Sequence, residues 1–218
     1  APDTRVPYFE QALFAFYRNN IIPAVRNIGG LGIISDKGIL NLSIVMNKPK
    51  DNFSINEGYE LMTSFIKAIF PEGADKIEAI EIANSYCPGD YDLSIDGKKF
   101  AGIAQRKIKE AVVVSIYISI FGDQQKRANI MKDFYEIGID DQEVRYKYPK
   151  VDPECMETLE NLLNKKFTLE DVFERVEKVL YGLDCDLEKG EYTEAMVEEY
   201  NEIFKQAKER NESYLEGK

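Results

Sequence analysis

Apolar and polar residues alternate along several segments with the two-residue period of a half-buried β-strand. Residues 39–46 show this period most cleanly, and valine or isoleucine at alternate positions of 111–121 predicts a long interior strand. Residues 77–83, with the sequence IEAIEIA, also predict a strand. The expected apolar face of the first of these strands carries Leu40, Leu42, Ile44 and Met46.

A β-hairpin is predicted where residues 91–95 and 98–106 flank Asp96-Gly97, a strong signal for a two-residue turn. Counting outward from this turn pairs Ser94 with Lys99. Each hairpin face carries one lysine and is partly apolar, so the period does not decide which lysine faces a site. Strict alternation groups Lys99 with Ala101, Ile103 and Gln105, and Lys98 with Phe100, Gly102 and Ala104.

In most of the remaining chain, the apolar residues are spaced as in α-helices. Ser54 precedes Glu57 by three residues, the spacing of a capping box, so we expect a helix from there to Pro71. Its predicted buried face carries Leu61, Phe65, Ile66 and Ile69. Further helices are predicted over residues 8–18, 123–137, 153–164, 168–182 and 192–212.

This order of elements predicts an α+β fold, with a mostly antiparallel sheet flanked by helices and then a helical C-terminal subdomain. A polar, proline-containing connector at 140–154 separates the two regimes. We therefore expect a core over residues 1–148 and the subdomain over 149–218. Its charged helices are expected to present a solvated face over a narrow apolar stripe.

The net charge of the chain limits the kinds of partner that it is expected to bind. The 218 residues carry a net charge of −11, which disfavours nucleic acid and anionic membranes, since both attract clustered lysine and arginine. No apolar run reaches the ~18 residues of a membrane span. The three cysteines form no Cys-x-x-Cys pair and are interpreted as free thiols of a cytoplasmic protein.

The chain has no histidine, which excludes Ser-His and Cys-His catalysis and any histidine-ligated metal. Cys87 is the candidate nucleophile because it directly precedes the Pro88-Gly89 turn beside the lysine-bearing hairpin. A buried structural cysteine is the alternative interpretation. Cys155 and Cys185 are interpreted as structural.

A nucleophilic Cys87 needs a nearby cation, since a thiol of pKa about 8.5 is only about 10% ionised at pH 7.5. A straight hairpin would place Lys99 ~23 Å away, at 3.3 Å per residue. The loop after Cys87 must therefore fold back over the sheet if Lys99 is to activate it.

Gly29, Gly30 and Gly32 form a second candidate segment. It lacks the lysine of a phosphate-binding P-loop, and a strand is predicted to follow it. Two interpretations remain: a tight turn between strands, or close approach of the backbone to a ligand.

Both candidate stretches carry a resemblance. VRNIGGLGIISDKGILNLSIV (25–45) resembles the Arg-Arg-x-x-Gly-Gly-Gly segment of the biotin/lipoate protein ligase family, and YDLSIDGKKFAGIAQRK (91–107) resembles that family's lysine-bearing hairpin. The cysteine-containing SYCPGDYDLSIDGKKFAGIAQR (85–106) is most similar to the octanoyltransferase branch. The family pattern also includes a further N-terminal segment, and this chain begins inside that pattern.

The resemblance implies a reaction. Cys87 would form an acyl thioester, and Lys99 would approach the acyl carbonyl and favour the thiolate. Octanoyl would pass from a lysine of the glycine cleavage H protein to a lysine of an E2 lipoyl domain, without a metal or cofactor. The residues implied to bind substrate are Arg26, Gly29, Gly30, Asp92, Gly102 and Gln105.

Other functions remain open. Leu31 and Ser35-Asp36 stand where the ligases commonly have a third glycine and a His-Asp pair, which disfavours ATP-dependent lipoate ligation. An octanoyltransferase that uses octanoyl-acyl carrier protein is a second alternative. The alternative outside enzymes is a module that binds lipoyl domains or acyl groups without transferring them.

Overall fold

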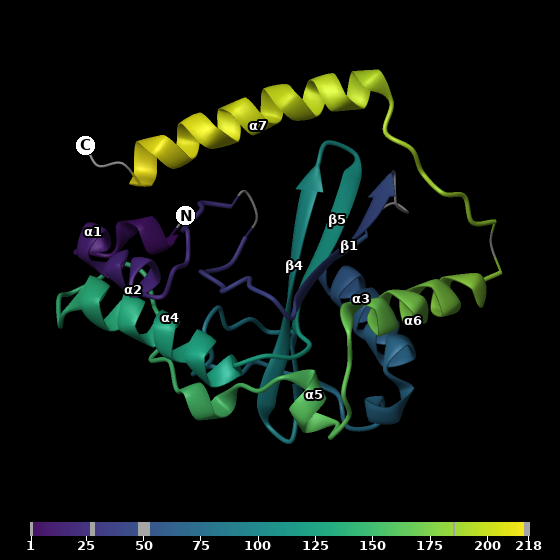
Figure 1. Cartoon of the computed structure of the whole chain (residues 1–218), viewed down its shortest axis with the longest axis horizontal. Coiled ribbons are helices and arrows are strands. Elements are labelled where there is room, and N and C mark those ends of the chain that lie inside the picture. The colour runs from purple at the N-terminus through teal and green to yellow at the C-terminus, as the bar shows by residue number, and fades with distance from the viewer. Residues whose placement is uncertain (1, 27–28, 48–52, 185, 216–218) are drawn as a thin grey trace.

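The computed structural model describes residues 2–26, 29–47, 53–184 and 186–215. The strands are β1 (Ile39–Asn47), β2 (Glu78–Ala79), β3 (Asp92–Ile95), β4 (Lys98–Ile108) and β5 (Ala111–Ser119). Within the described ranges they form one antiparallel sheet in the order β1–β5–β4–β3–β2 (Figure 1). The predicted hairpin is confirmed as β3 and β4, and β5 is the predicted interior strand.

The register of the sheet gives it an apolar and a polar face. Leu42 pairs with Ile116, which pairs with Ile103, so an apolar row crosses three strands. Because successive residues point to opposite faces, the next row lies on the other side. α3 (Ile55–Ile69) and α6 (Leu169–Tyr181) pack on the apolar face (Figure 1). The row on the opposite face is Ser43, Ser115 and Ala104.

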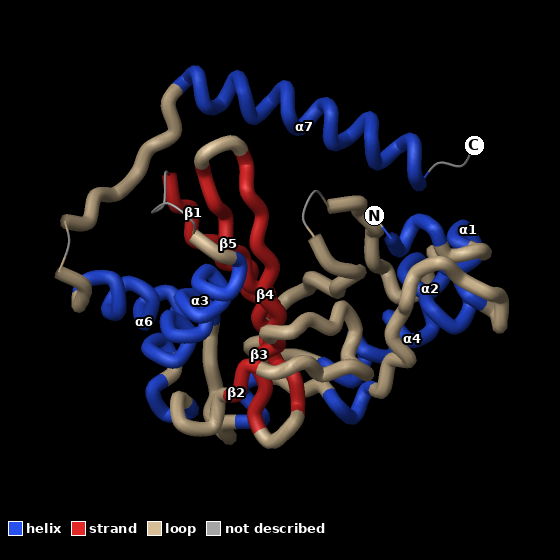
Figure 2. The backbone as a smooth tube through the Cα atoms, turned by 180° about the vertical axis from the view of Figure 1, so that it is seen from behind, coloured by secondary structure: helices blue, strands red, loops and turns tan. Residues whose placement is uncertain are grey.

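A second apolar core lies on the other side of the sheet (Figure 2). It joins η1 (Pro2–Arg5), α1 (Phe9–Ala12) and α2 (Phe14–Tyr17) to α4 (Gln124–Ile139). The ring of Phe134 on α4 stacks on Phe16 with centroids 4.9 Å apart. The helix predicted over 8–18 is present as α1 and α2, which follow one another with Leu13 between them.

α3 begins as predicted. Ser54 Oγ accepts a hydrogen bond from Glu57 N at 3.1 Å, and Glu57 Oε2 accepts one from Ser54 N at 2.8 Å. The buried stripe runs through Met62, Ile66 and Ile69. Leu61 is 40% exposed, so its predicted place on the buried face was wrong. The helix is rotated so that Met62, four residues before Ile66, occupies that position instead.

Two predicted elements are shorter than expected because backbone groups bond elsewhere. The strand predicted over 77–83 is reduced to β2, and beyond it Ile82 N donates to the carboxylate of Asp92 at 3.2 Å. The helix predicted over 153–164 is divided into η3 (Pro153–Cys155) and α5 (Leu159–Leu162). Between them, Glu157 N donates to Lys99 O of β4 at 3.0 Å.

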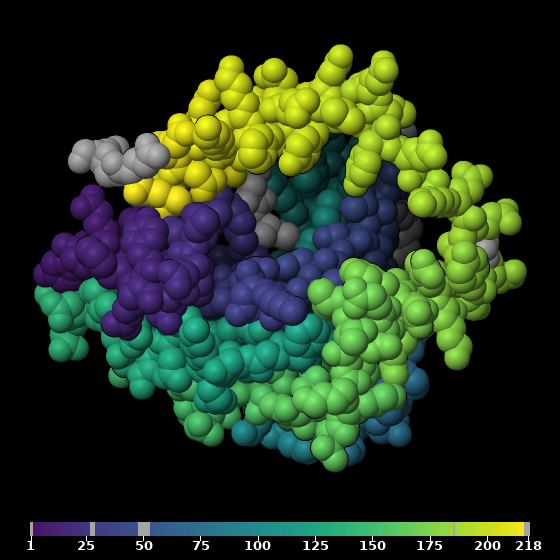
Figure 3. All heavy atoms as spheres, viewed as in Figure 1, coloured from purple at the N-terminus to yellow at the C-terminus, as the bar shows by residue number. Residues whose placement is uncertain are grey.

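The C-terminal elements differ in how they contact the sheet. Leu159, Phe167 and Val172 are buried in the same apolar cluster as the sheet, and a separate subdomain over 149–218 stays a prediction. α7 (Glu194–Leu215) lies across a hollow of the surface (Figure 3). Its exposed apolar residues include Met196, Val197, Tyr200, Ile203 and Phe204.

None of the described helices is long and apolar enough to cross a membrane.

An ion-pair cluster fastens α6 beside α3. Glu72, in η2 (Pro71–Gly73), accepts hydrogen bonds from Arg175 Nη2 at 2.9 Å and Lys165 Nζ at 2.7 Å. Burial acts to raise the pKa of Glu72, but the hydrogen bonds from Arg175 and Lys165 outweigh it and lower the pKa to about 2.

The substitution Glu72→Gln should lower the free energy of unfolding at pH 7 by no more than about 1 kcal/mol, because these side chains are partly exposed and screened. A carboxylate whose pKa is lowered by folding stabilises the protein above its ordinary pKa of 4.5 and loses that effect as the pH falls toward 2. Urea unfolding at pH 7, 5, 4 and 3 should therefore show the difference from wild type shrinking below pH 4.5. Glu198→Gln on exposed α7 is the control, and a difference independent of pH would contradict the assignment.

Candidate active site

Cys87 lies in the connection between β2 and β3, with its backbone in the left-handed region at φ 49°. This conformation is uncommon for a residue other than glycine and costs about 1–3 kcal/mol unless the surroundings hold it. Asp92 N donates to Gly89 O at 3.1 Å, which closes the turn after Pro88. The thiol is half-buried.

The ammonium group of Lys99 holds this loop over the sheet. Lys99 Nζ donates to the carbonyl oxygens of Cys87 at 2.7 Å and Tyr86 at 3.1 Å, and to Ser85 Oγ at 3.1 Å. Lys99 is 1% exposed. The loop therefore folds back over the sheet, as an activating role of Lys99 would require, and the long separation of a straight hairpin does not arise.

A β-bulge decides which face Lys99 occupies. Ser94 pairs with Lys99 as predicted, but Leu93 pairs with Ala101, so one residue of β4 is skipped. The extra residue shifts the alternation of side chains by one position. Lys99 therefore lies beside Gly102, where an added Cβ would be 3.6 Å from Nζ. The predicted grouping of Lys99 with Ala101, Ile103 and Gln105 was wrong for this reason.

Asp92 is the ion-pair partner of Lys99. Its Oδ1 lies 2.9 Å from Lys99 Nζ, and both side chains are 2% exposed. Its Oδ2 also accepts hydrogen bonds from the N–H groups of Ile82 and Gly89, each at 3.2 Å. Burial raises the pKa of Asp92, while the ammonium and the two N–H groups act in the opposite direction. The carboxylate thus connects β3, β4 and the cysteine loop.

The glycine segment closes over the sulfur of Cys87. Leu31 N donates to Sγ at 3.1 Å, and Arg26 Nη2 donates to it at 3.8 Å. Gly30 has φ +89°, and a Cβ added there would lie 2.9 Å from Sγ. Gly30 therefore combines a turn that favours glycine with a close approach to the sulfur of Cys87. Approach of this backbone to a ligand stays a prediction.

These elements enclose a cavity of about 510 Å³ on the polar face of the sheet. On the polar face, β1 contributes Asn41 and Ser43 to the cavity, and β5 contributes Ser115 and Tyr117. The cysteine loop and the glycine segment form its walls. Gln105 lines the cavity, but an added Cβ at Gly58 of α3 would lie 1.9 Å from its Oε1, so its amide points toward α3. All eight site residues predicted from the sequence line this cavity: Arg26, Gly29, Gly30, Cys87, Asp92, Lys99, Gly102 and Gln105.

A buried polar network behind the cavity was missed by the sequence reasoning. The hydroxyl groups of Tyr86 and Tyr117 hydrogen-bond to each other, and Gln124 Nε2 donates to Tyr86 Oη at 3.0 Å. Ser119 Oγ in turn donates to Gln124 Oε1 at 2.7 Å. Burial raises the pKa of Tyr86 to about 12, so the phenol is neutral. The network anchors Tyr86, the residue before Cys87, to β5 and α4. No local sequence pattern predicts it.

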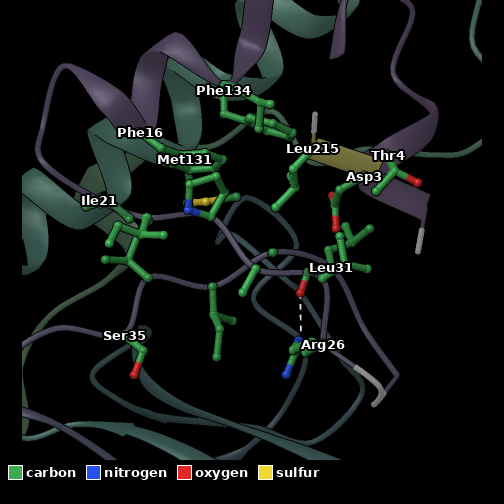
Figure 4. Close-up of a pocket in the computed structure, with 18 of the residues that line it drawn as sticks. Asp3, Thr4, Phe16, Ile21, Arg26, Leu31, Ser35, Met131, Phe134 and Leu215 are labelled. Carbon is green, nitrogen blue, oxygen red and sulfur yellow. Dashed lines mark hydrogen bonds between the residues drawn. The ribbon is translucent and has the colours of Figure 1, made fainter. Parts of the chain in front are cut away.

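The glycine segment also borders a second cavity of about 280 Å³ (Figure 4). Arg26, Gly30 and Ile33 line both cavities. The walls of the second cavity are mainly apolar and include Phe16, Met131, Phe134 and Leu215 (Figure 4).

The structure gives Cys155 no catalytic setting. Burial raises the pKa of Cys155 to about 11, and the nearby Asp152 acts in the same direction, so its thiol is a poor nucleophile. Cys185 lies outside the described residues. Within the described part of the chain, no cluster of three cysteine, aspartate or glutamate side chains is arranged to hold a metal ion.

Comparison with known proteins agrees with this geometry. The model of the lipoyl protein ligase A/B catalytic domain matches residues 5–181. The chain belongs to this family. It is 42% identical to an octanoyl-[GcvH]:protein N-octanoyltransferase of Lysinibacillus sphaericus over 98% of the chain and 77% of that relative. A relative with the same name from Oceanobacillus iheyensis is 40% identical over 97% of the chain and 76% of its own length.

Solved structures show that the lipoyl protein ligase A/B fold is present. A putative lipoate protein ligase from T. acidophilum with bound lipoic acid superposes with a TM-score of 0.70 at 18% identity, covering 96% of this chain and 80% of that one. Lipoate-protein ligase A bound with ATP superposes at 0.68 and 19% identity, covering 91% and 75%. At these identities the likeness concerns the fold alone.

In this lipoyl protein ligase A/B domain, Gly30→Ala should reduce alkylation of Cys87 by iodoacetamide at pH 8 by about tenfold or more. The added methyl group meets Sγ at 2.9 Å and the backbone has φ +89°, so the loop or the sulfur must move. Gly29→Ala is the matched control, because a Cβ there meets no described atom within 4 Å. Equal rates in the two variants, with circular dichroism unchanged, would show that Gly30 does not position the sulfur.

Proposed function

We propose that this chain is an acyltransferase that moves octanoyl from a lysine of the glycine cleavage H protein to a lysine of an E2 lipoyl domain. The observation that carries the proposal is the setting of Cys87, whose carbonyl group is bound by a buried lysine and whose sulfur borders a 510 Å³ cavity. The names of the relatives supply the acyl group and the donor. The acceptor rests on the family resemblance.

The reaction has two steps. The Cys87 thiolate attacks the carbonyl carbon of the octanoyl-lysine amide, the C–N bond breaks, and the donor lysine leaves as an amine after gaining a proton. The amine of the acceptor lysine then attacks the thioester, loses a proton, and the C–S bond breaks to restore the thiolate. One amide replaces another, so no ATP is required, and the covalent intermediate divides one difficult transfer into two easier ones.

In the proposed reaction, Lys99 and Asp92 assist at the acyl carbonyl. Their ion pair borders the cavity next to Gly102, where an added Cβ would lie 3.6 Å from Nζ and 3.7 Å from Asp92 Oδ1. Burial raises the pKa of Asp92, which favours sharing the proton within the pair. The pair can therefore deliver a proton to the leaving amine and take one from the incoming amine.

Intact-mass spectrometry of the chain after incubation with octanoylated H protein tests the proposal. We expect the mass of one octanoyl group on the wild type, its loss on addition of an E2 lipoyl domain, and no acylation of Cys87→Ser. Cys155→Ser is the control and should transfer within a few-fold of wild type, because its thiol has a raised pKa of about 11.

Three outcomes would contradict the proposal. Labelling only by octanoyl-acyl carrier protein would assign the other donor, and labelling only with octanoate and ATP would assign ligation. Binding of lipoyl domains without acylation would indicate a non-catalytic module.

A further inference from the structure

Among the described residues, two groups donate hydrogen bonds to the sulfur of Cys87, and they belong to Arg26 and Leu31 rather than to Lys99. Leu31 N lies 3.1 Å from Sγ, and Arg26 Nη2 lies 3.8 Å from it. A neutral thiol is a weak acceptor, whereas a thiolate accepts such bonds well. Two donors converging on one sulfur, one of them charged, are therefore the setting of a thiolate.

Arg26 is held in this position by the same residue that supplies the other donor. Its Nη2 donates to Leu31 O at 2.7 Å, the contact drawn as a dashed line in Figure 4. The peptide groups of Leu31 thus bind the sulfur through N–H and the guanidinium through C=O. Because a guanidinium stays charged at every relevant pH, the positive charge beside the sulfur is permanent.

Among the described residues, the hydrogen bonds of Lys99 are directed away from the sulfur of Cys87. An ammonium group carries three N–H bonds, and Lys99 Nζ has four acceptors within 3.1 Å: Cys87 O, Tyr86 O, Ser85 Oγ and Asp92 Oδ1. Its charge is also offset by the carboxylate of Asp92. Lys99 therefore holds the backbone of Cys87 in its left-handed conformation.

We propose that Arg26 and the N–H group of Leu31 stabilise the Cys87 thiolate before the acyl donor arrives. The inference deepens the proposed function and rests on it. Ionisation releases the thiol proton to water, and the negative charge stays on sulfur between the two donors. When the S–C bond forms, that charge passes to the acyl oxygen, two bonds away, so the guanidinium remains close to it. Arg26 is then a catalytic residue. Lys99, besides its proposed role in proton transfer, is a positioning residue that holds the backbone of Cys87.

The test measures the rate of Cys87 alkylation by iodoacetamide between pH 5 and pH 10, in a reaction that forms an S–C bond and releases iodide. Arg26→Met should raise the pH midpoint by about one unit or more, which lowers the rate at pH 7 about tenfold. Arg26→Lys should shift the midpoint less, because it keeps a charge without the fixed fork. Arg145→Met, which removes one exposed arginine, should leave the midpoint unchanged.

An unchanged midpoint in Arg26→Met, with circular dichroism like that of wild type, would overturn the inference. If Arg26→Met does not fold, Arg26→Gln takes its place, and an unchanged midpoint in that variant would overturn the inference. Alkylation needs no acyl donor, so the two proposals fail separately. A shifted midpoint in a chain that transfers no octanoyl would contradict only the proposed function, and normal transfer with an unshifted midpoint would contradict only this role of Arg26.

Discussion

The buried ion pair of Lys99 and Asp92 is the interaction on which the site depends. It is 2.9 Å long, and both side chains are 2% exposed. Charges removed from water in this way are retained only where further hydrogen bonds satisfy them. Here the further partners belong to the connection between β2 and β3, and they include the Ser85 hydroxyl and backbone groups of the cysteine loop. The loop therefore satisfies the ion pair, and the ion pair holds Cys87 in a strained backbone conformation.

This constraint explains why segments distant in the chain meet at one sulfur. With the loop fixed over the polar face of the sheet, Sγ lies within reach of Arg26 and Leu31, and Gly30 leaves room for it. The roles are divided among the neighbours of Cys87. Lys99 and Asp92 hold its backbone, and Arg26 and Leu31 contact its sulfur. A cysteine without a histidine partner is thereby placed between a charged donor and an acyl-sized cavity.

Much of the fold could be predicted because its determinants are local. Alternation defined β1 and β5, Asp96-Gly97 fixed the hairpin, and Ser54 with Glu57 fixed the start of α3. The β-bulge beside Lys99 could not be predicted, because strict alternation assumes a regular pairing that the register shift breaks. The backbone there also bonds Glu157, 58 residues away in the chain, which no local pattern indicates.

The site residues were placed in one cavity through family resemblance, but their contacts were not. Lys99 was expected to approach the acyl carbonyl and favour the Cys87 thiolate, which stays a prediction, and its bond to the carbonyl oxygen of Cys87 was not foreseen. Asp92, expected at the substrate, pairs with that lysine. A double-mutant cycle of Lys99→Met and Asp92→Asn, followed by urea unfolding, tests this account most directly. Each single change leaves a buried charge unpaired, so the double variant should be more stable than the sum predicts by about 2 kcal/mol or more. Additivity within about 0.5 kcal/mol would contradict the claim that this pair holds the site together.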